Sequence, residues 1–83
     1  MEIEIGKITH YFNRINVAVL ELSGELKLAD EIHILGHITD FSQFVNSMEI
    51  NHQKIVKAGP GMDVALLVEE YVRAGDTVFK VTE

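Results

Sequence analysis

The sequence predicts a small all-β domain that spans the whole chain, residues 1–83. Short runs with β-branched or alternating apolar residues recur between turn residues, and this spacing is typical of a small barrel or sandwich. One phrase also occurs twice: a small residue and an Asp precede an alternating run at Ala29-Asp30 and again at Gly75-Asp76. Each copy predicts a tight turn that begins a strand.

The early elements follow from local patterns. Ile3, Ile5 and Ile8 surround Gly6, which predicts a first strand with a bulge or a close backbone approach at the glycine. Residues 17–22 are almost continuously apolar, which predicts a strand that is buried on both faces. A turn follows at 23–25, and the next run, 31–35, ends at a glycine.

Two later segments fit either a helix or a strand. Residues 40–50 carry apolar side chains at both helical and alternating spacing, so periodicity leaves the choice even. From Asp63 onward the spacing matches one helix face, with Asp63 as a cap and Gly75 as an end, and it slightly favours a helix. Val64, Leu66 and Val68 also alternate, as in a strand. The periodicity alone therefore does not decide these two segments.

The composition indicates one compact unit with an acidic surface. Hydrophobic residues make up 47% of the chain, and no linker or low-complexity tract divides it. The 13 acidic and 7 scattered basic residues give a net charge of −6, which argues against tight phosphate binding. The chain lacks Cys, and its acidic, alternating start and short apolar runs do not match a signal peptide or membrane span. We therefore expect a cytoplasmic location and no membrane partner.

The residues show no pattern typical of catalysis, metal binding or nucleotide binding. His33 and His37 share a helical spacing, but in an extended segment they stand roughly 13 Å apart, so ordinary histidines are favoured over a metal site. No G-x-S-x-G or G-x-x-x-x-G-K-[ST] motif is present. We predict a non-enzymatic chain that needs no cofactor and binds no nucleotide by itself. Tyr11 and Phe12 beside Asn13-Arg14 suggest a base-stacking platform, although packing of the two rings is favoured.

Over nearly its whole length the chain resembles the second domain of translational GTPases such as elongation factor Tu. The matching segments are Gly6-Lys7-Ile8-Thr9-His10, Val17-Ala18-Val19-Leu20, residues 26–36, Asp40-Phe41, Ser47-Met48-Glu49-Ile50, residues 61–66 and Arg73-Ala74-Gly75-Asp76-Thr77-Val78. The chain looks closest to small standalone elongation-factor-like domains, and it is similar to a module at the C-terminus of collagenase-like peptidases. The resemblance implies a closed β-barrel in which both ambiguous segments are strands and residues 69–74 form a turn. The family usually has Gly where Ala29 stands, so the first Asp turn is expected to be built slightly differently.

The function that the resemblance implies is binding rather than catalysis, because the GTP chemistry of the family lies in another domain. The elongation factor barrel helps to hold the aminoacylated end of tRNA, and a glutamate there aligns with Glu49. We therefore predict a binding module related to translation-factor barrels that contacts RNA (tRNA or ribosome) or the translation machinery, with Glu49 as the candidate binding residue. The alternative is a protein-interaction or assembly domain like the module of collagenase-like peptidases. The net charge of −6 favours a protein partner over RNA.

Overall fold

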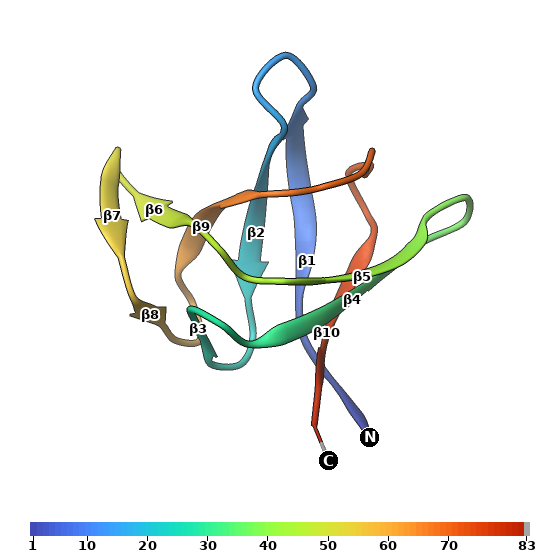
Figure 1. Cartoon of the computed structure of the whole chain (residues 1–83), viewed down its shortest axis with the longest axis horizontal. Coiled ribbons are helices and arrows are strands. Elements are labelled where there is room, and N and C mark those ends of the chain that lie inside the picture. Colours follow the sequence, from blue (N-terminus) through green and yellow to red (C-terminus); the bar gives the residue numbers. More distant parts are fainter. Residues whose placement is uncertain (83) are drawn as a thin grey trace.

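The computed structural model describes residues 1–82, which form ten β-strands and no helix (Figure 1). The strands are β1 (Glu2–Phe12), β2 (Val17–Leu22), β3 (Leu26–Lys27), β4 (Glu31–Leu35), β5 (Asp40–Phe44), β6 (Met48–Ile50), β7 (Gln53–Ile55), β8 (Lys57–Ala58), β9 (Asp63–Leu67) and β10 (Thr77–Val81). The all-β prediction is confirmed. Within the described chain, no helix is long and apolar enough to cross a membrane.

Eight strands form one antiparallel sheet in the order β5-β4-β10-β1-β2-β9-β6-β7, while β3 pairs only with β8. The sheet is strongly curved, but β5 and β7 remain its two ends and do not pair with each other. The closed barrel that the resemblance implied is therefore not supported. A side chain of β5 instead reaches the end of β9: the Gln43 amide donates to the Leu67 carbonyl (3.0 Å) and accepts from the Glu69 N–H (2.8 Å). The edge strand β5 is thereby tied to the segment that follows β9.

Both ambiguous segments are extended. Residues 40–50 contain β5 and β6, and the segment from Asp63 begins with β9, so the slight preference for a helix there was wrong. The reason is that Val64, Leu66 and Val68 all enter the core, which requires period-two alternation. The resemblance had assigned these segments correctly, and residues 69–74 form an irregular connection with bends and turns.

The core is a single aliphatic cluster enclosed by the curved sheet. Its largest fully buried side chains are Ile5, Ile8, Leu20, Leu26, Ile32, Ile34, Val45, Met48, Val64, Leu66, Val72 and Val78. They come from both halves of the chain, so long-range burial of apolar surface holds the ends of the sequence together.

Gly6 allows two strands to approach closely, as its position in the sequence predicted. The register of β1 against β10 shifts between Glu4 and Gly6, which marks a bulge. A Cβ atom at Gly6 would lie 2.5 Å from the carbonyl oxygen of Glu21 on β2. Only a residue without a side chain fits here.

The two Asp phrases begin neighbouring strands. β4 starts directly after Asp30 and β10 directly after Asp76. The two strands pair antiparallel, and His33 lies opposite Phe79, each of them three residues beyond its Asp. The repeated phrase is thus a repeated structural unit with an approximate local two-fold relation.

Candidate functional site

Strand β2 has one buried face and one open face. Ala18, Leu20 and Leu22 lie in the core, whereas Val17 and Val19 point outward and are only half-buried. The prediction that this strand is buried on both faces was therefore only half correct, because the outer side chains Val17 and Val19 are only partly covered. An uncovered row of β-branched side chains is the first sign of a binding surface.

Neighbouring strands extend this apolar row. In the register, Val17 lies opposite both Phe12 and Leu67, and Val19 lies opposite Ala65. Together with nearby residues they form an open hollow of about 470 Å³, which we call the outer groove. Its lining residues are Phe12, Ile15, Val17, Val19, Ser47, Glu49, His52, Ala65 and Leu67. The volume lies within the range of about 300–1,000 Å³ that is usual for ligand sites.

Two hairpins form the walls of the outer groove. Phe12 and Ile15 come from the β1–β2 hairpin, and Glu49 and His52 come from the β6–β7 hairpin. The second hairpin turns through Asn51 and His52, whose φ angles are +51° and +63°. A two-residue type I′ hairpin turn requires positive φ at both of its central residues. Figure 1 shows both hairpin tips at the upper end of the molecule, and β9 lies between β2 and β6 in the sheet.

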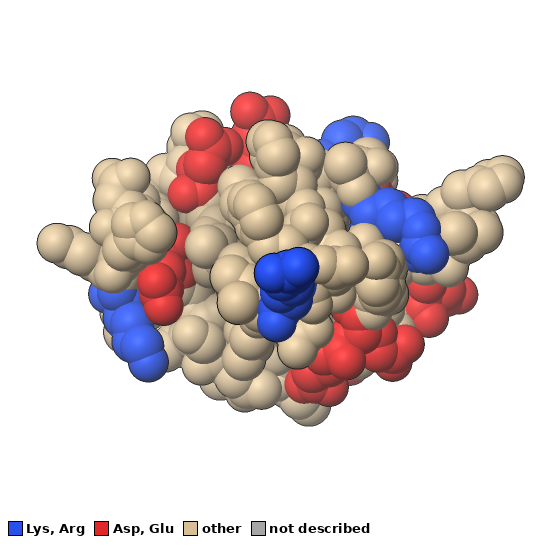
Figure 2. Space-filling view, turned by 90° about the horizontal axis from the view of Figure 1, so that it is seen from above, with Lys and Arg blue, Asp and Glu red and all other residues tan. Residues whose placement is uncertain are grey.

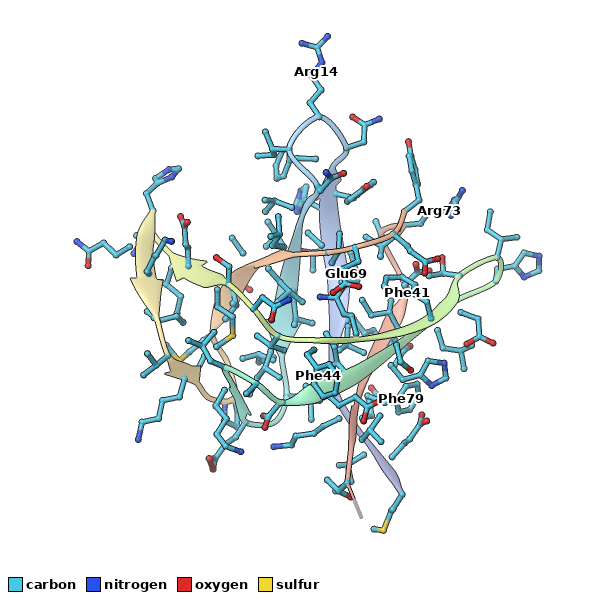
Figure 3. All side chains as sticks on the ribbon, viewed as in Figure 1. Arg14, Phe41, Phe44, Glu69, Arg73 and Phe79 are labelled. Atoms are coloured by element: carbon cyan, nitrogen blue, oxygen red, sulfur yellow. The ribbon has the colours of Figure 1, made fainter. Side chains whose placement is uncertain are left out.

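Charged groups of both signs are scattered over this side of the molecule. Figure 2, which looks down on the upper end, shows separate basic side chains, acidic groups gathered mainly toward the margins, and broad uncharged areas between them. Arg14 projects from the tip of the β1–β2 hairpin, away from the sheet (Figure 3). No continuous basic strip of the kind that follows a nucleic-acid backbone is visible on this face.

Glu49, the residue that the resemblance selected, lies in the outer groove. It is half-buried on β6, opposite Ala65 on β9. Within residues 1–82 its carboxylate makes no hydrogen bond and no ion pair, although Lys54 is its neighbour in the register of β7. Lys54 lines a different hollow. Whether Glu49 binds anything stays a prediction, but its position gives it an uncovered surface to act on.

The suggested stacking platform of Tyr11 and Phe12 is not formed, because consecutive strand residues point to opposite faces. Tyr11 packs edge-on against Tyr71, with ring centroids 4.9 Å apart. Phe12 lies in the outer groove and stacks beside His10 at 6.4 Å. The apolar contribution of Phe12 to a groove was missed, since the sequence does not show which strands lie beside it.

A second polar cluster surrounds His33 on the outer side of β4. Nδ1 lies 2.8 Å from a carboxylate oxygen of Glu2 and Nε2 lies 2.6 Å from one of Asp40, so the protonated ring can donate to both. The hydrogen bonds to Glu2 and then Asp40 raise the pKa of His33, because both favour the protonated ring. Both ring nitrogens are thus occupied by carboxylates, and His37 is separate and exposed. Across the described residues, no group of three or more His, Cys, Asp or Glu side chains is placed to hold a metal ion.

The chain is similar in sequence to proteins described as proteases. It is 36% identical over 83 residues to an uncharacterised protease of Methanocaldococcus jannaschii, across 99% of this chain and 20% of that protein. It is 37% identical over 81 residues to a collagenase of Porphyromonas gingivalis, across 95% of this chain and 20% of the collagenase. The chain therefore spans about a fifth of the length of the curated relatives it matches. No protein-family model matches it.

Solved structures show the same fold. The C-terminal domain of a Geobacillus thermoleovorans protein assigned to the U32 peptidases superposes with a TM-score of 0.88, covering 94% of this chain and 91% of that domain at 17% identity. Its selenomethionine variant gives a TM-score of 0.85 over 90% of this chain and 95% of that one, also at 17% identity. The predicted similarity to a module of collagenase-like peptidases is confirmed. None of the proteins named above is a translation factor, so they lend no support to a kinship with elongation factor Tu.

Proposed function

We propose that the chain is a non-catalytic protein-docking module, of the kind that accompanies collagenase-like peptidases, and that the outer groove is its docking surface. The observation that carries the proposal is the open apolar floor made by Val17 and Val19 on β2 and by Ala65 and Leu67 on β9. Apolar strand faces that remain exposed in a small domain mark interaction sites. The similarity to one fifth of much longer proteases supports a role as an accessory unit.

Docking would proceed by burial of this floor against a partner. Phe12 and Leu67 are 51% and 44% exposed, so both have surface to lose on contact. Each Å² of apolar surface removed from water contributes about 25 cal/mol, part of which offsets the entropy lost on association. The mechanism needs no nucleophile, metal or cofactor on this chain.

The test uses the M. jannaschii relative produced without its segment similar to this chain, that is, its remaining four-fifths. We expect this chain, added in trans, to form a complex with it in size-exclusion chromatography and isothermal titration calorimetry. The relative's own segment serves as the positive control. Absence of a complex with this chain, while the relative's own segment binds, overturns the proposal.

A matched pair of variants tests the surface. Leu67→Glu places a charge on the groove floor, whereas Leu35→Glu makes the same change at the end of β4, where Leu35 is 39% exposed. We expect Leu67→Glu to weaken the complex at least about tenfold and Leu35→Glu to leave it unchanged, because only one charge must be buried on docking. Equal effects of the two variants would place the interface elsewhere.

The resemblance to translation-factor barrels suggests a second hypothesis, which is that the chain contacts RNA through Glu49. The net charge of −6 argues against it. We expect no retention of tRNA in filter binding at about 50 mM salt, where phosphate contacts are strong. Retention that Glu49→Ala removes without lowering the melting temperature would favour RNA over the docking function.

A further inference from the structure

The outer groove combines an apolar floor with carboxylates that form no ion pair within residues 1–82, although Lys54 lies opposite Glu49 in the register of β6 and β7. Glu49 is half-buried in its wall and has no hydrogen bond or salt bridge to any residue of the described chain. An ionised carboxylate that loses water without gaining a partner is unfavourable, so it binds an arriving cation more readily than a fully solvated group does.

A second acidic site continues the same face. Glu21 and Asp63 lie directly opposite each other on β2 and β9, and alternation places them on the side of Val19 and Ala65. Like charges at facing positions of two strands destabilise the pairing. On its other side, Glu21 faces Lys7 on β1 in the register. The Lys7 ammonium donates a hydrogen bond to the Thr77 hydroxyl (3.4 Å) and forms no ion pair among residues 1–82. Neither carboxylate of this pair forms an ion pair within residues 1–82, and both lie at exposed positions at the end of the apolar floor.

We infer that the outer groove receives a segment of a partner protein in which apolar side chains stand beside Lys or Arg. The apolar side chains would cover Val17, Val19 and Leu67, and the cations would reach Glu49 on one side and the Glu21–Asp63 pair at the end. Charge complementarity selects this occupant over a second copy of the chain, whose net charge of −6 would be repelled. The inference rests on the proposed docking function and names the chemistry of the partner.

The probe is a phage-displayed library of short random peptides, selected against the immobilised chain and counter-selected against Leu67→Glu. We expect enrichment of peptides that join aliphatic or aromatic residues to Lys or Arg. Enriched peptides without an excess of Lys or Arg over the starting library contradict the inference. So does a selection that yields no binder dependent on Leu67.

A charge-matched pair of variants then tests Glu49 with one enriched peptide in fluorescence polarisation. Glu49→Gln removes the carboxylate of the groove, and Glu31→Gln removes a half-buried carboxylate on β4 outside it. We expect Glu49→Gln to weaken binding about tenfold and Glu31→Gln to leave it unchanged, with the difference shrinking at high salt. Equal affinities of the two variants overturn the role of Glu49. The two proposals can fail separately. If the chain forms a complex with the truncated protease but the peptide selection yields no such binder, the proposed partner chemistry is rejected and the docking function is retained.

Discussion

Two turns of the same sequence type, residues 27–30 and 73–76, are built alike but serve the fold differently. In each, the Asp carboxylate accepts a hydrogen bond from the backbone N–H three residues earlier: Lys27 donates to Asp30 at 3.0 Å and Arg73 donates to Asp76 at 2.9 Å. In each, the Asp N–H also donates back to the carbonyl of that earlier residue. The local chemistry of the repeated phrase is therefore the same in both places.

Each turn is also fastened to one buried residue by a reciprocal pair of backbone hydrogen bonds. Ala29 donates to the Val45 carbonyl, and Val45 donates to the Asp30 carbonyl, both at 2.9 Å. In the second turn, Gly75 donates to the Ile8 carbonyl, and Ile8 donates to the Asp76 carbonyl, both at 2.8 Å. The first turn thus joins the β4 start to the end of β5, and the second joins the β10 start to β1.

The surroundings of the two carboxylates differ. The Asp30 side chain is 10% exposed and pairs with the ammonium of the exposed Lys27 at 2.8 Å. Asp76 is 5% exposed and packs directly against the backbone of Gly36, where a Cβ atom would overlap its carboxylate. A short phrase therefore specifies the turn, while the neighbouring residues that the fold brings to it set how much stability the turn contributes.

The largest expected effect is that of Asp76→Ala. It leaves the Arg73 N–H without its acceptor in a buried site and opens space beside Gly36, so we expect a loss of about 3 kcal/mol in the free energy of unfolding. Chemical denaturation monitored by circular dichroism measures it. Glu70→Ala, at an exposed position in the connection after β9, serves as the control and should change stability little. A loss at Asp76 no larger than at Asp30 would break the comparison.

Gly36→Ala tests the packing against Asp76 from the other side. The added methyl group must displace the carboxylate, at an expected cost of about 2 kcal/mol. In the Asp76→Ala background the same change should cost much less, because the overlapping atoms are gone. Additive effects in this double-mutant cycle would show that the two residues do not constrain each other.

Asp30→Asn is expected to cost about 1 kcal/mol near neutral pH, since its partner Lys27 is exposed and the ion pair is screened. Partial burial raises the pKa of Asp30, but the hydrogen bonds from Lys27 and the charges of Lys27 and Lys80 together lower it below its ordinary value of 3.8. A depressed folded-state pKa contributes stability that is present above 3.8 and lost as pH falls through the folded value. The difference between wild type and Asp30→Asn should therefore shrink in acid, as denaturation at successive pH values would show.

The last pair of variants concerns the residue before each Asp, and Ala29→Gly has the smallest expected effect. Gly75 has φ of +97° and Ala29 has φ of +75°, so the expectation that alanine changes the construction of the first turn was wrong: Ala29 accepts the left-handed conformation. Gly75→Ala should destabilise by about 1 kcal/mol. Ala29→Gly should stabilise by only a few tenths of a kcal/mol, because the glycine also gains entropy in the unfolded chain. Thermal melting of both variants checks the sign, and a loss of stability in Ala29→Gly would contradict the account.

Much of the fold was predictable from local patterns, and the candidate site only in part. The bulge at Gly6 and the Asp turns rest on backbone rules that act within a few residues. The resemblance selected Glu49, and the structure places it in the outer groove. The groove itself was not predictable, because Val17 and Val19 look the same in sequence whether their outer face is covered or open.

No pattern in the sequence indicated that the two end strands of the sheet, β5 and β7, do not pair with each other. In the sequence, Gln43 looks like an ordinary polar residue of a strand. In the structure it is 4% exposed, and its amide links β5 to the end of β9 and the segment after it. The segment from Asp63 is a second case in which the sequence pattern does not decide the structure. Its apolar residues fit both a helix and a strand, and the strand forms because alternating residues pack into the core.

Residue types and their spacing were sufficient to specify an all-β chain, its turns and its acidic surface, because those features depend on backbone conformation and charge within a short stretch. Which apolar face stays open, which carboxylates lack a partner and how the sheet ends were settled only in the folded chain. Those features depend on contacts between strands far apart in the sequence, as between Val17 and Leu67, and such contacts exist only once the core has formed.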